Sequence, residues 1–235
     1  MQDRNYRELK EFCLREGADL FGVADISGIK EEFNLSKPLI ENLDKAVCIG
    51  VRLSTQILND IKDAPTKLYF HHYRTANFFL DQLGFKLANW IQRKDALALP
   101  IAASVIVDWQ KQTAHASHKK IGVLAGLGWI GRNNLLVNPK FGSQFRLATV
   151  FTNFKIKADK LLDMDCGDCY DCVKVCPVGA IQEKKEDFKH SLCFEKLKEF
   201  QRSNIVGQYI CGICVRSCGG ESAKKSLVDN NRVVI

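Results

Sequence analysis

The spacing of apolar residues predicts alternating helices and strands over the first 155 residues. Apolar positions three and four apart predict a helix over residues 6–13, ended by Gly17, and a long amphipathic helix over residues 76–91. Apolar, β-branched runs predict four strands, at residues 20–26, 46–53, 102–107 and 147–152. Strands that alternate with helices favour an α/β sheet.

The distribution of cysteine divides the chain. Of 10 cysteines in 235 residues, only Cys13 and Cys48 precede residue 155. One lies on the apolar face of a predicted helix and the other inside a predicted strand, so both are expected to be buried structural residues. The charged stretch 155–160 marks the expected boundary between an α/β domain, residues 1–157, and a cysteine-rich domain, residues 158–235.

The first cysteine set matches C-x2-C-x2-C-x3-C-P. It consists of Cys166, Cys169, Cys172 and Cys176, followed by Pro177. Each iron of a [4Fe–4S] cubane needs one thiolate, and the short spacings let one loop supply three corners. The fourth cysteine of such a run ligates the other cluster.

The second cysteine set supplies the ligands that complete two sites, and it consists of Cys193, Cys211, Cys214 and Cys218. Gly219 follows Cys218 at a position where proline is usual, but this departure does not change the number of ligands. We assign cluster one to Cys166, Cys169, Cys172 and Cys218, and cluster two to Cys193, Cys211, Cys214 and Cys176. Zinc, disulfides and mixed or three-iron clusters are the alternatives, but zinc sites use paired CxxC units without the x3-C-P tail.

Charge and hydropathy indicate in which compartment the protein works and which partners it could bind. The chain begins with a charged segment, and its longest apolar run, residues 97–107, is shorter than a membrane span of about 20 residues. We expect a soluble, reducing, cytoplasmic protein without a membrane partner. The formal charge of +7 would become about +3 with eight thiolates and two oxidised clusters, which suits an acidic redox partner or RNA.

A glycine-rich segment precedes the cysteines. Gly126, Gly128 and Gly131 form a GxGxxG that follows a predicted helix, residues 113–124, whereas a dinucleotide fingerprint opens a βαβ unit. One interpretation is a tight turn with Trp129 in the core. The other is a loop whose backbone amides approach a large ligand, since polar residues crowd it.

Several polar residues near this segment are further candidates. His115 and His118 could donate a proton or hydrogen-bond a cofactor, or could belong to a solvated helix turn. Lys119, Lys120 and Arg132 could pair with cofactor amides, with phosphate or with RNA, or could lie on a charged solvated face.

The segment AGLGWIGRNNLLVNPKFG, the following LATVFTN and the two cysteine sets resemble the epoxyqueuosine reductase family, as does EGADLFGVA near the start. The resemblance covers nearly the whole chain. It implies a cobalamin-dependent iron–sulfur reductase, related to reductive dehalogenases, with a nitroreductase-like α/β cobalamin domain beside a ferredoxin-like double [4Fe–4S] domain. The glycine loop would then line a corrinoid pocket.

The resemblance also implies site residues. Asp108 matches the family's Val-Asp dipeptide and would be the catalytic proton donor, although Trp109-Gln110 replaces the usual sequence after it. The other interpretation of Asp108 is a strand-end residue or a cap. Tyr73 lies near the family's Tyr-His pair. The expected cofactor-binding residues are Tyr73, His118, Gly126, Gly128, Trp129, Gly131, Arg132 and Asn133.

Three functions follow as hypotheses. The first is a reductase that takes electrons from a ferredoxin or flavodoxin and passes them through the clusters to cobalamin and on to a small-molecule or modified-nucleoside substrate. The second is a cobalamin-free electron-transfer protein that docks a partner enzyme, and the third an RNA-binding module with structural clusters. Family members carry a helical-repeat region after the clusters, whereas this sequence stops at Ile235, so we expect weak affinity for tRNA and inefficient turnover.

Overall fold

The computed structural model describes residues 1–109 and 112–220, and it divides into two compact units. The first, here the sheet unit, comprises Met1–Val51, Thr75–Leu127 and Arg146–Leu162. The second, here the cysteine unit, comprises Arg52–Arg74, Gly128–Phe145 and the chain from Asp163 onward. Both units are therefore assembled from segments that are discontinuous in sequence.

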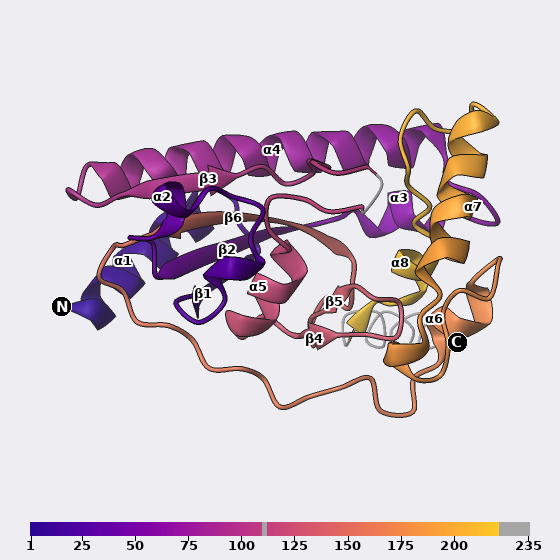
Figure 1. The fold of residues 1–235 in the computed structure, drawn as a ribbon. Coiled ribbons are helices and arrows are strands. Elements are labelled where there is room, and N and C mark those ends of the chain that lie inside the picture. The colour runs from indigo at the N-terminus through magenta and orange to yellow at the C-terminus, as the bar shows by residue number, and fades with distance from the viewer. Residues whose placement is uncertain (110–111, 221–235) are drawn as a thin grey trace, which may run out of the picture. The chain divides into compact units, whose positions relative to one another are not determined.

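A four-stranded sheet forms the centre of the sheet unit (Figure 1), in the order β1-β2-β6-β3. The strands are β1 Leu20–Asp25, β2 Lys45–Arg52, β3 Ala98–Ile101 and β6 Phe145–Thr152. β1 pairs antiparallel with β2, placing Leu20 opposite Gly50, and β3 pairs antiparallel with β6, placing Ala98 opposite Thr152. Nearly every residue of β2 and β6 is buried, as expected of central strands covered on both faces.

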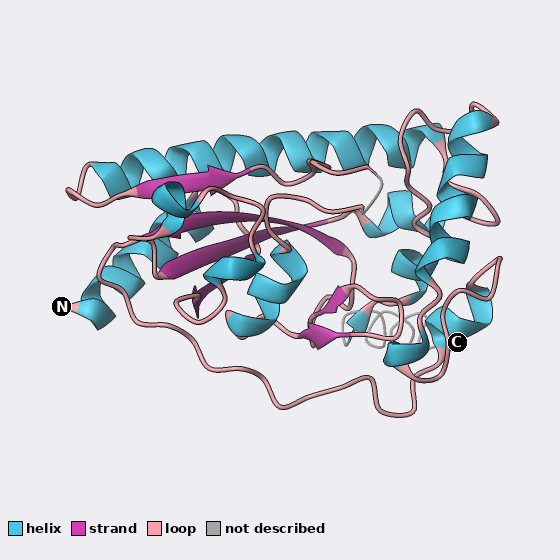
Figure 2. Cartoon of the chain, viewed as in Figure 1, coloured by secondary structure: helices cyan, strands magenta, loops and turns pink. Residues whose placement is uncertain are grey.

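Helices cover the sheet (Figure 2). The unit contains α1 Gln2–Arg15, α2 Lys37–Ile40, a 3-10 turn η1 Lys30–Glu32, α5 His118–Leu124 and most of α4, Lys67–Gln92. α5 packs against β1 so closely that a Cβ on Gly22 would lie 2.3 Å from the carbonyl oxygen of Ala125. Within the described residues, no helix combines the length and the apolar character needed to span a bilayer.

The sequence predicted much of this unit. The predicted helices over residues 6–13 and 76–91 are confirmed inside α1 and α4, and three of the four predicted strands are β1, β2 and β6. Cys13 and Cys48 are both fully buried, as expected, and burial raises the pKa of the Cys48 thiol to about 12. Both are inert core residues at neutral pH.

Two predicted elements are wrong in extent. The third strand is Ala98–Ile101 rather than residues 102–107, because the edge position of β3 tolerates Pro100. The helix predicted over residues 113–124 begins only at His118, because Ser117 is its N-cap and accepts a hydrogen bond from the Lys120 amide.

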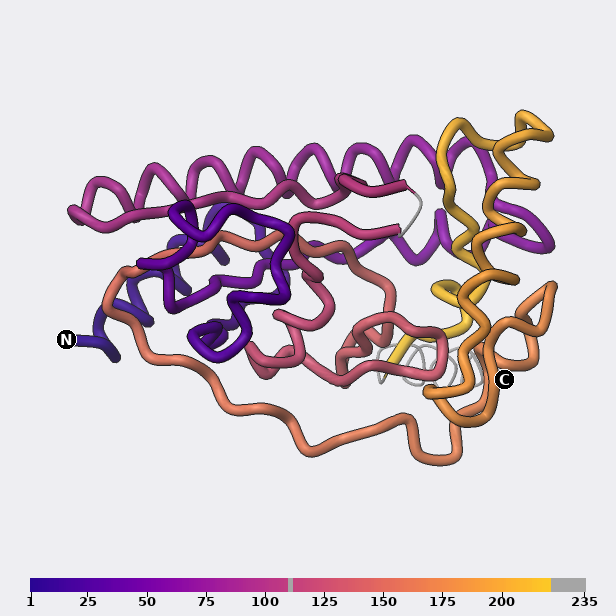
Figure 3. Tube along the Cα trace, viewed as in Figure 1, coloured from indigo at the N-terminus to yellow at the C-terminus, as the bar shows by residue number. Residues whose placement is uncertain are grey.

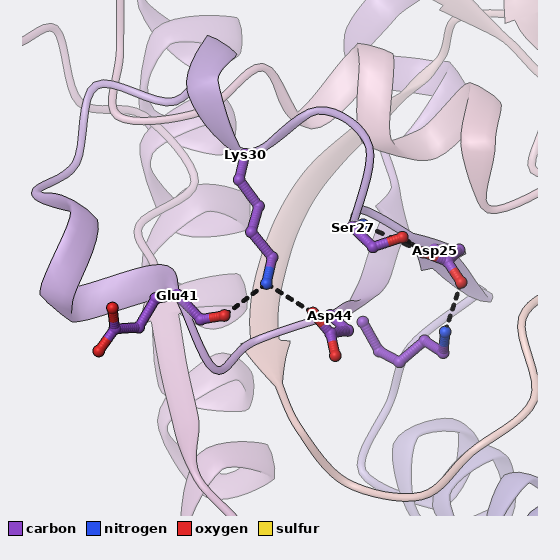
Figure 4. Close-up of polar contacts among 6 residues, drawn as sticks. Asp25, Ser27, Lys30, Glu41 and Asp44 are labelled. Carbon is purple, nitrogen blue, oxygen red and sulfur yellow. Dashed lines mark hydrogen bonds and ion pairs between the residues drawn. The ribbon is translucent and has the colours of Figure 1, made fainter.

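Charged contacts close the end of the β1–β2 pair (Figure 4). Lys45 donates to Asp25 at 2.5 Å, and Ser27 donates to the same carboxylate from its hydroxyl at 2.6 Å and its amide at 3.0 Å. Lys30 donates to the Glu41 carbonyl and to Asp44. The Lys45 bond, followed by the Ser27 bonds, lowers the pKa of Asp25 from 3.8 to about 2. This contribution to stability is present above pH 3.8 and is lost as the pH falls towards about 2.

The segment after β6 carries no helix or strand up to the first cysteine (Figure 3) and is fastened to the sheet unit through Asp159. The Asp159 carboxylate accepts the Tyr6 hydroxyl at 2.9 and 3.0 Å and the Val23 amide at 2.8 Å, and the Asp159 amide donates to the Val23 carbonyl at 2.7 Å. Burial, and then the Asp159 carboxylate, raise the pKa of Tyr6. Asp159 therefore joins α1, β1 and this segment.

We expect Tyr6→Phe to lower the free energy of unfolding by about 1–2 kcal/mol, because it removes a hydrogen bond to a charged, partly buried acceptor. Denaturant unfolding followed by circular dichroism measures the loss. The matched control is the same substitution in an Asp159→Ala background, where it should cost nothing further. An equal cost in both backgrounds would mean that the hydroxyl stabilises the fold through another contact.

The cysteine unit is built from short elements. They are α3 Thr55–Asn59, the first turns of α4, the hairpin β4 Trp129–Ile130 and β5 Leu136–Val137, α6 Asp171–Val175, η2 Lys185–Asp187, α7 His190–Arg202 and α8 Ile213–Ser217. α6 packs on α8, and α8 also contacts α3. Each of the two packed helices contains one cysteine of a CxxC pair, Cys172 in α6 and Cys214 in α8, so their packing brings the two cysteine sets together.

Candidate functional site

The first group of thiols draws three cysteines from the first motif and one from the second. The Cys169 amide donates to the Cys166 carbonyl at 3.0 Å, which curls the loop, and α6 then presents Cys172. Burial, followed by the proximity of Cys218, Cys166 and Cys169, raises the pKa of Cys172 to about 11. These four sulfur atoms are thus mutual neighbours.

The second group of thiols lines a mostly apolar cavity. Its walls are formed by Asn133, Cys176, Pro177, Val178, Ile181, Phe188, Cys193, Lys196, Leu197, Cys211, Ile213 and Cys214. The pKa of Cys211 is raised to about 11, mainly by burial and in part by the nearby Cys193 and Cys176. The cavity therefore brings together four cysteines: Cys193 of α7, Cys211 just before α8, Cys214 of α8 and Cys176 at the end of the first motif.

Both groups have the donor chemistry of a cubane site. Burial raises the pKa of Cys172 in the first group and of Cys211 in the second, and the iron of a cluster would replace the protons of such thiols. Among the described residues, no three His, Cys, Asp or Glu side chains converge on a single metal ion. A cubane requires no such convergence, because each thiolate binds a different iron. The residues present fit two [4Fe–4S] clusters.

The second and third glycines of the motif, Gly128 and Gly131, flank β4 of the β4–β5 hairpin in the cysteine unit. Trp129 pairs with Val137, and its indole Nε1–H donates to the Cys166 sulfur at 3.3 Å. A Cβ on Gly128 would lie 1.8 Å from the Val137 carbonyl oxygen, and one on Gly131 would lie 2.5 Å from the Val137 side chain. The hairpin's own packing therefore requires glycine at both positions.

Arg132 binds the first cysteine loop. Its guanidinium donates to the carbonyl oxygens of Gly167 at 2.9 Å, Cys169 at 3.1 Å and Glu183, and it lies 4.2 Å from the centre of the Tyr170 ring. The planar fork of arginine suits this simultaneous contact with several carbonyls. In this structure, the Arg132 guanidinium, which we predict to bind a corrinoid, donates to these carbonyl oxygens.

Asn133 begins a buried polar chain that leads to Cys218. Its amide nitrogen donates to the Ser143 hydroxyl oxygen at 3.1 Å, and its carbonyl oxygen accepts the Leu135 amide at 3.2 Å. Ser143 in turn hydrogen-bonds Cys218, and its amide donates to the Cys218 carbonyl at 2.9 Å. Because the hydroxyl oxygen accepts from Asn133, the hydroxyl proton is left to donate to Cys218.

The structure also locates the remaining predicted cofactor residues. In the sheet unit, His118 Nε2 lies 2.9 Å from the Ala102 carbonyl and Nδ1 lies 2.8 Å from the Thr149 hydroxyl, so the chain engages both ring nitrogens of a neutral histidine. Gly126, at φ +66°, ends α5 in the same unit. Tyr73 belongs to the cysteine unit, where its ring lies 6.3 Å from that of Tyr69.

Asp108 lies on a loop of the sheet unit, not at a strand end. Two hydrogen bonds with Thr113, at 3.2 and 3.1 Å, close the loop, and Asp108 is half-buried. Its neighbours Val107 and Trp109 are 42% and 58% exposed. Asp108 thus lies between two exposed apolar residues of this loop.

Sequence reasoning missed Ser143, Tyr170 and the Ala180 amide, which donates to the Cys176 sulfur at 3.2 Å. Ser143 directly follows Gly142 at the end of the glycine-rich segment, and this position is the only feature of the sequence that could have pointed to it. A backbone amide leaves no signal in the sequence.

No protein-family model matches the chain. Its fold is that of a catabolic reductive dehalogenase solved with 3-bromo-4-hydroxybenzoic acid, at a TM-score of 0.76, 18% identity and coverage of 99% of this chain and 35% of that one. It is also that of epoxyqueuosine reductase from Streptococcus thermophilus, at a TM-score of 0.63, 19% identity and coverage of 91% and 65%. The chain thus shares the fold of these two kinds of reductase.

Sequence relatives identify the family. An epoxyqueuosine reductase from Leadbetterella byssophila is 40% identical over 92% of this chain and 80% of the relative. One from Bacillus cereus is 30% identical over 56% of this chain, an alignment that spans only 37% of the relative's length. The chain belongs to the epoxyqueuosine reductase family.

Proposed function

We propose that this chain is an iron–sulfur reductase that carries two [4Fe–4S] clusters, passes electrons through them to a corrinoid and reduces a modified nucleoside of the epoxyqueuosine type. The observation that carries the proposal is the assembly of eight cysteines into two groups of four, each completed by a cysteine from the other motif. When bound, each cluster exchanges single electrons at low potential.

The chain's own residues hold and orient this site. Arg132 fixes the carbonyls of the first cysteine loop, so the thiols of Cys166 and Cys169 remain in place before and after an electron arrives. The apolar wall formed by Val178, Ile181 and Phe188 keeps water away from the second group. Dry, fixed surroundings are the protein's means of controlling electron transfer.

Asp108 is the proposed proton donor. Loss of an epoxide oxygen as water consumes two electrons and two protons, so a reductase of this kind needs an acid near its substrate. A loop position supports this role, because a related structure from Bacillus subtilis is described with its catalytic aspartate loop swung out of the active site. Another related structure contains an epoxyqueuosine-modified tRNA stem loop, which supports the substrate class.

The proposal that a corrinoid binds rests on family membership and on the fold. Arg132, His118 and Asn133, which the resemblance implies as corrinoid-binding residues, hydrogen-bond groups of the chain itself in this structure. The alternative function is a cobalamin-free electron-transfer protein that shares the clusters but lacks the corrinoid and docks a partner enzyme.

Titration of the anaerobic protein with cob(II)alamin, followed by electron paramagnetic resonance, separates the two. We expect saturable binding of one equivalent in protein whose clusters are intact. Asp108→Asn should retain both the clusters and the corrinoid signal but lose about 100-fold or more in turnover of an epoxyqueuosine stem loop, the size of a general-acid effect. Asp95→Asn, on an exposed turn, is the matched control and should keep full turnover.

Absence of cob(II)alamin binding at high micromolar concentration, with both clusters present, would favour the electron-transfer protein. Full turnover by Asp108→Asn would exclude Asp108 as the acid. A preparation with stoichiometric zinc in place of iron would overturn the proposal as a whole.

A further inference from the structure

We propose that Trp129, through its indole N–H, raises the reduction potential of the cluster held by Cys166, Cys169, Cys172 and Cys218. The inference rests on the proposed function, because it requires a cluster at this site. Trp129 would then set the reduction potential of the cluster through a hydrogen bond to Cys166, and it would not stack against a corrinoid.

The geometry fixes the indole relative to the cysteine loop. Trp129 lies in β4 and pairs with Val137 of β5, so its backbone cannot rotate freely. Its Nε1–H donates to the Cys166 sulfur at 3.3 Å, and a Cβ on Gly131 would lie 3.4 Å from the same sulfur. The hairpin therefore packs against this thiolate with a hydrogen-bond donor directed at it, and no substituent on Gly131 intervenes.

A second donor acts on the same group of thiols. The Ser143 hydroxyl, whose oxygen accepts from Asn133 at 3.1 Å, hydrogen-bonds Cys218. Asn133 and Ser143 are both at least nine-tenths buried, so water does not compete for these bonds. One short segment, residues 129–143, thus supplies a hydrogen bond to a cysteine from each of the two motifs.

The physical effect follows from charge. A [4Fe–4S] cluster gains one negative charge on reduction, and part of that charge lies on the thiolate sulfurs. An N–H or O–H donor stabilises the reduced form more than the oxidised form, because hydrogen bonds to greater negative charge are stronger. Hydrogen bonds to the sulfurs are an established determinant of cluster potential. Removal of the donor should therefore make this cluster harder to reduce.

The experiment is a redox titration of anaerobic holoprotein followed by electron paramagnetic resonance, with iron and sulfide assayed on the same samples. At the potential that half-reduces the wild-type cluster, the ratio of reduced to oxidised cluster should fall about threefold to tenfold in Trp129→Phe; tenfold equals about 59 mV for one electron. Ser143→Ala should shift the same cluster in the same direction. The potential of the second cluster should not change.

Each variant has a matched control. Trp90→Phe makes the same substitution in the sheet unit, where the ring contacts Phe12 and Phe154, and Ser217→Ala removes a hydroxyl that donates to the Cys214 carbonyl rather than to a sulfur. Neither should move either potential. If Trp129→Phe loses iron, benzothienylalanine at this position keeps the bicyclic ring and lacks only the N–H.

The outcomes separate the inference from the proposed function. An unchanged potential in variants that keep about eight iron per chain would overturn the inference and leave the clusters established. Wild-type protein that assembles no cubane would overturn both. A shift of equal size in Trp90→Phe would show that the change is not due to the hydrogen bond.

Discussion

Cys176→Ala should abolish the second cluster rather than the first, and Cys218→Ala should abolish the first rather than the second. In each variant the iron content of anaerobic protein should fall from about eight to about four atoms per chain. The reason is the crossing of ligands: Cys176 lies in the first motif but lines the cavity of the second group, whereas Cys218 ends the second motif but neighbours Cys172. Loss of one ligand leaves three thiols, which cannot hold a cubane firmly.

Spectra of paired variants identify which cluster remains. The electron paramagnetic resonance signal of reduced Cys176→Ala should match that of Cys214→Ala, and the signal of Cys218→Ala should match that of Cys172→Ala. Cys48→Ala is the control, because this buried cysteine lies in β2 and belongs to neither group. The opposite pairing, with Cys176→Ala matching Cys172→Ala, would show that each motif serves its own cluster.

Gly142→Ala should destabilise the cysteine unit by about 3 kcal/mol or more and remove the first cluster. Gly142 has φ +59°, which costs a residue with a side chain about 1–2 kcal/mol. In addition, a Cβ would lie 1.9 Å from the Cys218 carbonyl oxygen and 2.4 Å from its carbon, so the backbone of a cluster ligand would have to move. Chemical denaturation and the iron content measure the two effects.

Gly179→Ala separates conformational strain from the steric clash. Gly179 has nearly the same φ, +58°, but a Cβ at this position would meet no described atom within 4 Å. It should therefore lose only the strain term, about 1–2 kcal/mol, and keep about eight iron atoms. Equal losses in the two variants would mean that the backbone conformation, not the contact with Cys218, requires glycine at position 142.

The sequence predicted elements whose pattern is local. The apolar spacing of α1 and α4 and the β-branched runs of β1, β2 and β6 reflect burial that each segment undergoes regardless of its partners. The edge strand β3 and the start of α5 depend on which neighbour pairs and on which residue caps, so their boundaries were misplaced. The loop of Asp108 reads as an apolar run, yet its return through Thr113 leaves Val107 and Trp109 exposed.

For the candidate site, the spacing of the cysteines predicts how they group, but it does not show what the glycine motif contacts. The neighbourhoods of Cys172 and Cys211 agree with the predicted groups, and iron analysis is the test. Trp129 and Arg132, which we predict to contact a cofactor, hydrogen-bond a cysteine sulfur and the carbonyls of a cysteine loop in this structure. Such contacts join residues about 37 positions apart and leave no local pattern.

The discontinuity of the cysteine unit limits how this protein can be divided into fragments. A fragment that begins at Asp163 would contain all eight motif cysteines, yet it would lack the segments Arg52–Arg74 and Gly128–Phe145. It would thereby lose the indole over Cys166, the guanidinium that holds the first loop, and the carbonyl of Ile61 that binds Arg216 in α8. We therefore expect a fragment that contains only the eight cysteines to hold the clusters weakly. A design that transfers the clusters to another protein should also include the β4–β5 hairpin and residues 52–74.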